Sequence, residues 1–198
     1  MNFIFTFLVT FMIIFFSELG DKTQLLVLSF ATKDKVRNIL LGVALGTFLS
    51  HGIAIIFGSS IGSIQNTTFI FYTKIFTYST FLLFGIIGFI PKKEDKDSSS
   101  FLQKFTNLKF GYIFIVAFNI MIGEIGDKTF LASLGLGVEY PNYKISLILG
   151  SISGMVASNS IALFFGKILG NKLNQHFVEV LSNSIFIIFG LIGFISIF

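Results

Sequence analysis

Long runs of apolar residues, separated by short polar segments, dominate the chain. Six runs reach the roughly 20 residues that a helix needs to cross the ~30 Å hydrocarbon core of a bilayer. No run shows the two-residue alternation of a membrane barrel strand, so each run predicts a helix. The predicted spans cover residues 3–28, 38–58, 72–90, 110–136, 145–166 and 178–198.

Composition narrows the class of protein. Hydrophobic residues make up 54% of the 198 residues and charged residues only 12%, which is about half the charged share of a soluble chain. Cysteine is absent, which excludes a disulfide scaffold and a thiolate metal site. The basic residues form no continuous patch, so nucleic acid is not a predicted partner. We predict an all-α integral membrane protein that lies in the lipid bilayer, and not a soluble enzyme.

The basic residues predict the orientation of the chain. Cytoplasmic loops carry an excess of Lys and Arg, and with six spans the loops after spans 1, 3 and 5 share one side. Only Lys74 and Lys144 lie on the opposite side, together with both termini. We therefore expect both termini to be extracytoplasmic. The cytoplasmic side carries the ten residues Lys33, Lys35, Arg37, Lys92, Lys93, Lys96, Lys104, Lys109, Lys167 and Lys172.

The chain contains an internal repeat with three matching blocks in the same order. Residues 18–23 (ELGDKT) match residues 124–129 (EIGDKT) at an offset of 106. Residues 84–90 (FGIIGFI) match residues 189–195 (FGLIGFI) at an offset of 105. Between these blocks, at an offset of 108, the residues Gly42, Gly46, His51, Ala54 and Gly58 fall on Gly150, Gly154, Asn159, Ala162 and Gly166.

The repeat predicts the domain organisation: residues 1–90 form one three-helix unit, residues 91–109 a cytoplasmic linker, and residues 110–198 a second three-helix unit. Because three is an odd number, the second unit enters the membrane from the side where the first one ended. The halves are then inverted, which is a recurring architecture of secondary transporters with the site at the interface of the repeats. The predicted fold is six transmembrane helices in two inverted three-helix repeats.

Two acidic motifs interrupt the first and fourth predicted spans. A carboxylate at the bilayer centre costs ~2.5–3.5 kcal/mol even on the scale that penalises it least, so four such groups indicate a functional site. If the two halves meet, the site brings together the candidate metal ligands Glu18, Asp21, Glu124 and Asp127.

The spacing within each motif has two structural consequences. In a continuous helix, the i, i+3 spacing places Glu18 and Asp21 about 60° apart on one face, and the second motif repeats this spacing. Gly20 and Gly126 remove the side chain beside the acids. These glycines predict either a close approach of the facing helix or a local break that frees carbonyl groups for an ion.

The donor set predicts the kind of ion. Carboxylates, supplemented by the hydroxyls of Thr23 and Thr129, suit hard divalent cations: Ca²⁺, Mn²⁺ or Mg²⁺. His51, within the second span, offers at most one nitrogen, which disfavours Zn²⁺ or Cu⁺. The ion would be transported cargo, and no resident cofactor is predicted.

Protons are the second expected substrate. Buried carboxylates this close together cannot all remain charged without a cation, so protons and a divalent cation would compete for them. Competition at a site that opens alternately to each side produces cation/proton antiport. In the empty site Lys22 and Lys128 would serve as counter-ions. A purely structural alternative pairs each lysine with the glutamate four residues earlier, but that leaves Asp21 and Asp127 unexplained.

Further polar residues are candidates for a supporting role. Those of the second and fifth spans could complete the coordination of the ion, relay protons or form interhelical hydrogen bonds. Gln24 follows the first motif, whereas Phe130 stands at the matching position of the second. The glycine pairs Gly42–Gly46, Gly150–Gly154 and Gly85–Gly88 predict packing surfaces. The supporting candidates are Gln24, Ser50, His51, Ser158 and Asn159.

A hydrophobic chain of two three-helix halves, each with E-x-G-D-[KR]-[TS] in its first helix, resembles the Gdt-one type cation/proton exchanger family of the lysine-exporter superfamily. Both copies of the motif match without departure, at residues 18–23 and 124–129. The resemblance implies export of Mn²⁺, and in some members Ca²⁺, in exchange for protons. The short chain without a targeting extension favours the bacterial members, which resemble manganese exporters of the inner membrane.

Other functions fit the residues less well. An intramembrane aspartyl protease would need G-x-G-D, which neither motif contains. A passive channel conflicts with four carboxylates, because these would hold a divalent ion too tightly for fast conduction. Export of a small amino acid is the remaining alternative, because Lys22 and Lys128 could pair with a carboxylate. Nothing in the sequence indicates an oligomeric state.

Overall fold

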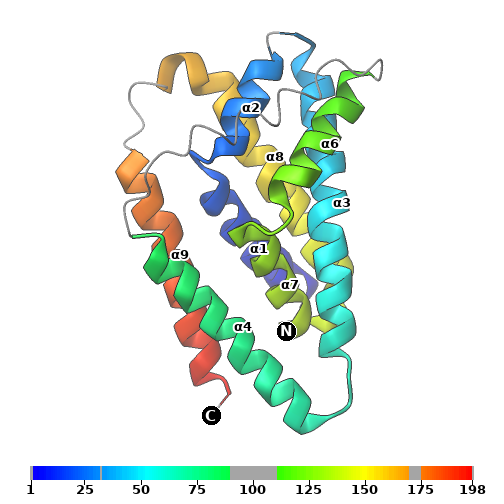
Figure 1. Cartoon of the computed structure of the whole chain (residues 1–198), viewed down its shortest axis with the longest axis vertical. Coiled ribbons are helices and arrows are strands. Elements are labelled where there is room, and N and C mark those ends of the chain that lie inside the picture. Colours follow the sequence, from blue (N-terminus) through cyan, green and yellow to red (C-terminus); the bar gives the residue numbers. More distant parts are fainter. Residues whose placement is uncertain (1, 32, 90–110, 170–174, 198) are drawn as a thin grey trace.

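The computed structural model describes residues 2–31, 33–89, 111–169 and 175–197, and this part of the chain is helical without any strand (Figure 1). The predicted all-α class is therefore confirmed, and the predicted linker 91–109 lies outside the described residues. The helices are α1 (Phe3–Glu18), α2 (Lys22–Ala31), α3 (Val36–Gly62), α4 (Thr67–Ile87), α6 (Tyr112–Glu124), α7 (Lys128–Glu139), the short 3₁₀ helix η2 (Pro141–Tyr143), α8 (Lys144–Leu169) and α9 (Gln175–Ile195).

Two of the predicted continuous spans are in fact broken. The run 3–28 divides into α1 and α2, and the run 110–136 divides into α6 and α7. The break falls inside the acidic motif in both cases, at Gly20 (φ 79°) and Gly126 (φ 86°). Left-handed backbone of this kind ends an α-helix and is accessible to glycine at little cost. The expectation that each acidic pair shares one face of a continuous helix is therefore wrong.

Helix length and hydropathy identify three candidate membrane spans within the described residues: Val36–Gly62, Thr67–Ile87 and Pro141–Phe164. Shorter apolar helices lie at Phe3–Glu18, Tyr112–Glu124 and Val180–Ile195. The first and fourth runs fall short as single helices because each is divided at its motif. Large exposed apolar side chains, such as Phe57 and Phe76, are typical of a surface that faces lipid.

Helices of one half pack on helices of the other: α1 packs on α8, and α6 packs on α3. Helix α1 lies along α8, where Ser146 Oγ donates to the Phe3 carbonyl oxygen at 2.6 Å. Helix α6 lies along α3 in the same way, and α4 packs against α9. In Figure 1 the matching helices of the two halves point in opposite directions: α1 and α2 run upward and α6 and α7 downward, whereas α3 runs downward and α8 upward.

Glycines make these helix contacts close. A Cβ at Gly46 would lie 2.6 Å from the Ala117 carbonyl oxygen, and one at Gly154 would lie 2.8 Å from the Phe11 carbonyl oxygen. A Cβ at Gly85 would lie 2.9 Å from the Asn183 carbonyl oxygen. Only a residue without a side chain admits a neighbouring backbone at this distance. The three predicted glycine pairs are therefore confirmed as packing surfaces.

Candidate cation-binding site

The candidate site lies where the two helix breaks meet in the middle of the bundle. Helix α1 ends at Glu18 and α2 begins at Lys22, while the backbone N–H of Asp21 donates to the Glu18 carbonyl at 3.2 Å. The second motif has the same form, since the Asp127 N–H donates to the Glu124 carbonyl at 3.1 Å. Each motif thus places a glutamate at the end of one helix and an aspartate just before the next.

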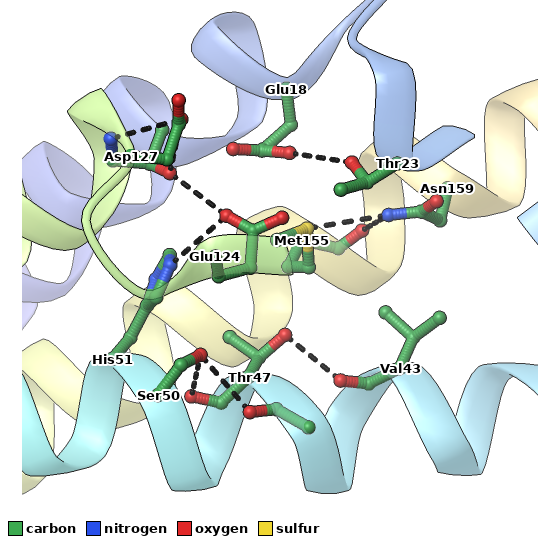
Figure 2. A network of polar contacts seen from close by, with 12 residues as sticks. Glu18, Thr23, Val43, Thr47, Ser50, His51, Glu124, Asp127, Met155 and Asn159 are labelled. Carbon is green, nitrogen blue, oxygen red and sulfur yellow. Dashed lines mark hydrogen bonds and ion pairs between the residues drawn. The ribbon is translucent and has the colours of Figure 1, made fainter. Parts of the chain in front are cut away.

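Three carboxylates from the two motifs lie close together. One carboxylate oxygen each from Glu18, Asp21 and Asp127 lie within 4.8 Å of one another. Glu18 is fully buried, whereas the two aspartates are half-buried. Figure 2 shows the Glu18, Glu124 and Asp127 carboxylates turned toward one another. Oxygen atoms at this spacing match the donor set of a hard divalent cation.

Glu124 contributes to the same region from a different direction. Its side chain is 1% exposed, and its Oε2 lies 3.6 Å from His51 Nε2 on α3. Glu124 is not part of the group formed by Glu18, Asp21 and Asp127. Of the up to four carboxylates that the two motifs could bring together, three form a cluster, and the fourth lies beside the imidazole of His51.

A threonine supports each glutamate in a matching way. Thr23 Oγ1 donates to Glu18 Oε2 at 3.2 Å, and Thr129 Oγ1 donates to Glu124 Oε2 at 3.1 Å. Thr129 Oγ1 also lies 3.3 Å from Asp127 Oδ2. The expected hydroxyls therefore lie at the carboxylates. Glu18 Oε1 and Glu124 Oε1 have no hydrogen-bond partner among the described residues, so both oxygens are available to a cation or a proton.

Gln24 links the first break to α8. Its Oε1 accepts from the Gly20 N–H at 3.0 Å, and its Nε2 donates to Ser158 Oγ at 2.6 Å and to the Ser158 carbonyl at 3.2 Å. A side chain with both ends engaged in this way positions the backbone at the break. The second half has Phe130 at this position and therefore cannot make the same hydrogen bonds.

The remaining supporting candidates differ in where they point. Ser50 Oγ donates to the Gly46 carbonyl of its own helix at 3.0 Å. Asn159 Nδ2 donates to the Met155 carbonyl at 3.0 Å and to Met155 Sδ at 3.3 Å. These bonds are local, whereas His51 Nε2 lies 3.6 Å from Glu124 Oε2.

Of the two lysines in the motifs, only Lys128 has a described side chain. The side chain of Lys22 lies outside the described residues. Lys128 begins α7 and is half-buried. Lys128 and Glu124 form no ion pair within 4.0 Å, so in the described second motif the i, i+4 salt bridge of the structural alternative is absent.

The sequence analysis did not select Asn119, which is 1% exposed on α6. Its Nδ2 donates to the Ile115 carbonyl at 2.7 Å, while its Oδ1 has no hydrogen-bond partner among the described residues. The signal was present in the sequence, because Asn119 is a polar amide in the apolar run YIFIVAFNIMIG. An amide within a membrane span marks a candidate functional position.

Apolar helices that enclose acidic residues at two helix breaks define an integral membrane protein of the transporter class, in which broken helices place ion ligands near the midplane. The family model described as "Divalent cation/proton antiporter GDT1" matches the chain over residues 6–96 and 112–198. The chain belongs to this family of divalent cation/proton antiporters, and it is a transporter and not an enzyme.

Similar proteins include bacterial and plant members. The chain is 28% identical over 176 residues to the "Putative manganese exporter" of Vibrio cholerae, covering 88% of this chain and 83% of that protein. It is 24% identical to "GDT1-like protein 1, chloroplastic" of Oryza sativa subsp. japonica, covering 94% of this chain and 61% of that protein. It is also 24% identical to "Protein PAM71, chloroplastic" of Arabidopsis thaliana, covering 90% of this chain and 54% of that protein. No solved structure matches the chain significantly.

Proposed function

We propose that this protein exports Mn²⁺ from the cytoplasm in exchange for protons, as a secondary active transporter that works by alternating access. The observation that carries the proposal is the meeting of Glu18, Asp21 and Asp127, whose oxygens lie within 4.8 Å of one another at two helix breaks. Carboxylates at this spacing repel one another, so they require a divalent cation or protons to neutralise them. A site with these two alternative occupants exchanges one for the other.

The ligands of the transported ion are Glu18, Asp21, Glu124 and Asp127. Thr23 and Thr129 hold the glutamates by hydrogen bonds of 3.2 and 3.1 Å. Broken helices also leave carbonyl groups at the ends of α1 and α6, which can coordinate a cation. A hard divalent ion suits this oxygen-rich set. Mn²⁺ is the proposed ion because the Vibrio cholerae relative is named as a manganese exporter, and Ca²⁺ is the second candidate.

Alternating access follows from a fold of six spans in two inverted repeats, with residues 1–90 and 110–198 as the repeated units. The opposite direction of the helices in the two halves (Figure 1) supports this fold. The packing of α1 on α8 and of α6 on α3 supports it as well. A two-fold axis in the membrane plane would relate these two helix pairs to each other. The family model also matches the chain in two segments.

We place the protein in the inner membrane of a bacterium, with both termini extracytoplasmic and the linker 91–109 cytoplasmic. The excess of Lys and Arg in the loops after spans 1, 3 and 5 supports this orientation. In Figure 1 both ends of the chain lie in the lower half of the view, where α3 turns into α4. An even number of spans brings both termini to one side in this way.

The test is divalent-driven proton flux in proteoliposomes that contain a pH-sensitive dye. Addition of Mn²⁺ should move protons in the opposite direction, and Asp21→Asn and Asp127→Asn should each reduce the flux by more than about 100-fold, because loss of even an indirect metal contact typically costs about 10–100-fold. Thr73→Val serves as a control with unchanged flux, because Thr73 is only half-buried on α4 and its hydroxyl donates to the Phe69 carbonyl of the same helix.

The other outcomes separate the alternatives. Metal entry without proton movement would indicate a channel or a uniporter. Efflux of a small amino acid that persists in Asp21→Asn would favour the organic substrate. No response to Mn²⁺ or Ca²⁺ would refute the proposed function.

A further inference from the structure

His51 occupies an unusual place beside the candidate site. Its side chain is 0% exposed on α3, and neither Nδ1 nor Nε2 has a hydrogen-bond partner among the described residues. A buried polar group without a partner is unfavourable, because it has lost its hydrogen bonds to water and gained none in the protein. The ring points toward Glu124 (Figure 2), so the free nitrogen faces the carboxylates and not the lipid. The position of the imidazole therefore indicates a ligand that arrives from the site.

The distance between His51 and Glu124 fits a shared ion better than a direct bond. Nε2 and Oε2 lie 3.6 Å apart, which is too long for a good hydrogen bond. Two ligands that each bind one ion at roughly 2.1–2.2 Å lie about 3.0–3.6 Å apart when the angle between them is about 90–110°. An ion between these atoms would engage both residues without a large movement.

The repeat shows that this nitrogen comes from one half only. Asn159 occupies the position of His51 in the second half, at the offset of 108. Its amide nitrogen donates to the Met155 carbonyl at 3.0 Å, so the nitrogen is turned back to its own helix. An amide also ligates hard cations through its oxygen. The site therefore has the chemistry of a carboxylate cluster with a single added imidazole.

We propose that His51 is a selectivity residue, whose Nε2 joins Glu124 as a ligand and favours Mn²⁺ over Ca²⁺ and Mg²⁺. This inference rests on the proposed function, because it concerns the ion that the same site transports. Ca²⁺ and Mg²⁺ take oxygen ligands almost exclusively. Mn²⁺ also suits oxygen ligands, but as a first-row transition ion it binds sites of mixed nitrogen and oxygen donors and accepts an imidazole beside carboxylates. One nitrogen therefore adds affinity for Mn²⁺ and adds little for the alkaline-earth ions.

The test compares ion selectivity in the full-length wild type and in His51→Asn, which installs the residue of the other half. Proteoliposomes are loaded with increasing Mn²⁺ or Ca²⁺, and the apparent KM for each ion is measured by proton flux. The KM for Mn²⁺ should rise at least about tenfold, in line with the ~10–100-fold effect of losing a contact at a metal site, while the KM for Ca²⁺ changes less than about threefold.

Thr47→Val is the matched control on the same helix. Thr47 is buried one turn before His51, and its Oγ1 donates to the Val43 carbonyl at 2.8 Å. The substitution removes a polar atom near the site without removing a nitrogen ligand. The ratio of the KM values for Mn²⁺ and Ca²⁺ should therefore equal that of the wild type.

The outcomes distinguish the two proposals. If the wild type moves protons with neither ion, the proposed function fails and His51 loses its role with it. If His51→Asn transports both ions with an unchanged KM ratio, or loses both equally, the selectivity role is refuted while the antiporter stands. Pulsed EPR of wild type loaded with Mn²⁺ gives a test that needs no variant. A ¹⁴N coupling from a directly bound imidazole supports the proposal, and its absence overturns it.

Discussion

The two halves of the chain carry the same acidic motif but hold the helix that follows it in different ways. In the first half, Gln24 joins the break to α8 through a 2.6 Å hydrogen bond to Ser158, and α2 contains no glycine. In the second half, α7 packs directly on the backbone of α3 at Gly137, where a Cβ would lie 2.6 Å from the Ile55 carbonyl oxygen. The motif thus determines the break, and residues outside the motif determine how the following helix is attached.

This difference bears on the proposed mechanism of alternating access. A transporter of inverted repeats needs each half to adopt two arrangements, one for each side of the membrane. A side-chain hydrogen bond can be exchanged for water when a helix moves, whereas a close contact between two backbones must separate as a unit. We therefore expect the α3–α7 contact to be the more stable of the two attachments.

The largest loss of stability should come from a substitution that separates α3 and α7. A Cβ at Gly58 would overlap the Leu134 carbonyl oxygen, so Gly58→Ala forces the helices apart. Overpacking of this kind costs about 1–3 kcal/mol and occasionally more. Thermal unfolding of the purified protein in detergent measures the loss. Gly52→Ala is the control, because the nearest heavy atom to its Cβ would be a Phe48 ring carbon at 3.6 Å; an equal loss in both variants would contradict the close contact.

A smaller loss of stability is expected at the break between α1 and α2. Gln24→Leu leaves the Gly20 N–H and the Ser158 hydroxyl without the partners that they have at 3.0 and 2.6 Å. Ser158 is buried and its hydroxyl oxygen accepts this bond, and a buried acceptor that loses its partner costs about 1–3 kcal/mol. Phe130→Leu, at the matching position of the second half, removes no hydrogen bond and should cost less than about 1.5 kcal/mol. Unfolding in detergent compares the two variants, and a larger loss in Phe130→Leu would reverse the assignment of the two attachments.

The smallest loss of stability is expected where α2 and α7 end. In the first half, Asn38 and the Lys35 N–H donate to Asp34 and lower the pKa of that carboxyl. In the second half, Glu139 at the end of α7 instead accepts a hydrogen bond from Lys74 Nζ of α4 at 3.3 Å. Asn38→Ala should raise the pKa of Asp34 toward its usual value of about 3.9, as measured by carboxyl NMR titration.

The sign of the pH dependence follows from the lowered pKa. The charged form of Asp34 is favoured in the folded state, so its contribution to stability is present above the usual pKa of about 4 and disappears as the pH falls through the lowered value. Asn38→Ala should therefore reduce stability slightly at pH 6 and not at pH 2. An unchanged pKa in the variant would show that Asn38 does not act on Asp34.

The sequence by itself determined the helical class, the repeat and the positions of the acidic motifs. Apolar runs of about 20 residues form helices in lipid because every backbone hydrogen bond is then satisfied locally, and this depends on neighbouring residues alone. The duplicated motif and its glycines could be identified for the same reason, because a motif is a pattern of neighbouring residues. The sequence left open whether Gly20 and Gly126 served close packing or a break, because both uses of glycine follow from its missing side chain.

Only the tertiary structure decided which polar groups meet. The clustering of Glu18 with Asp21 and Asp127, the approach of His51 to Glu124 at 3.6 Å, and the reach of Gln24 to α8 all join residues from different helices. Their separation depends on how α1 lies on α8 and α6 on α3, which is determined by packing at the glycines of α3 and α8. Contacts of this kind arise from the whole bundle, so a pattern along one chain does not specify them.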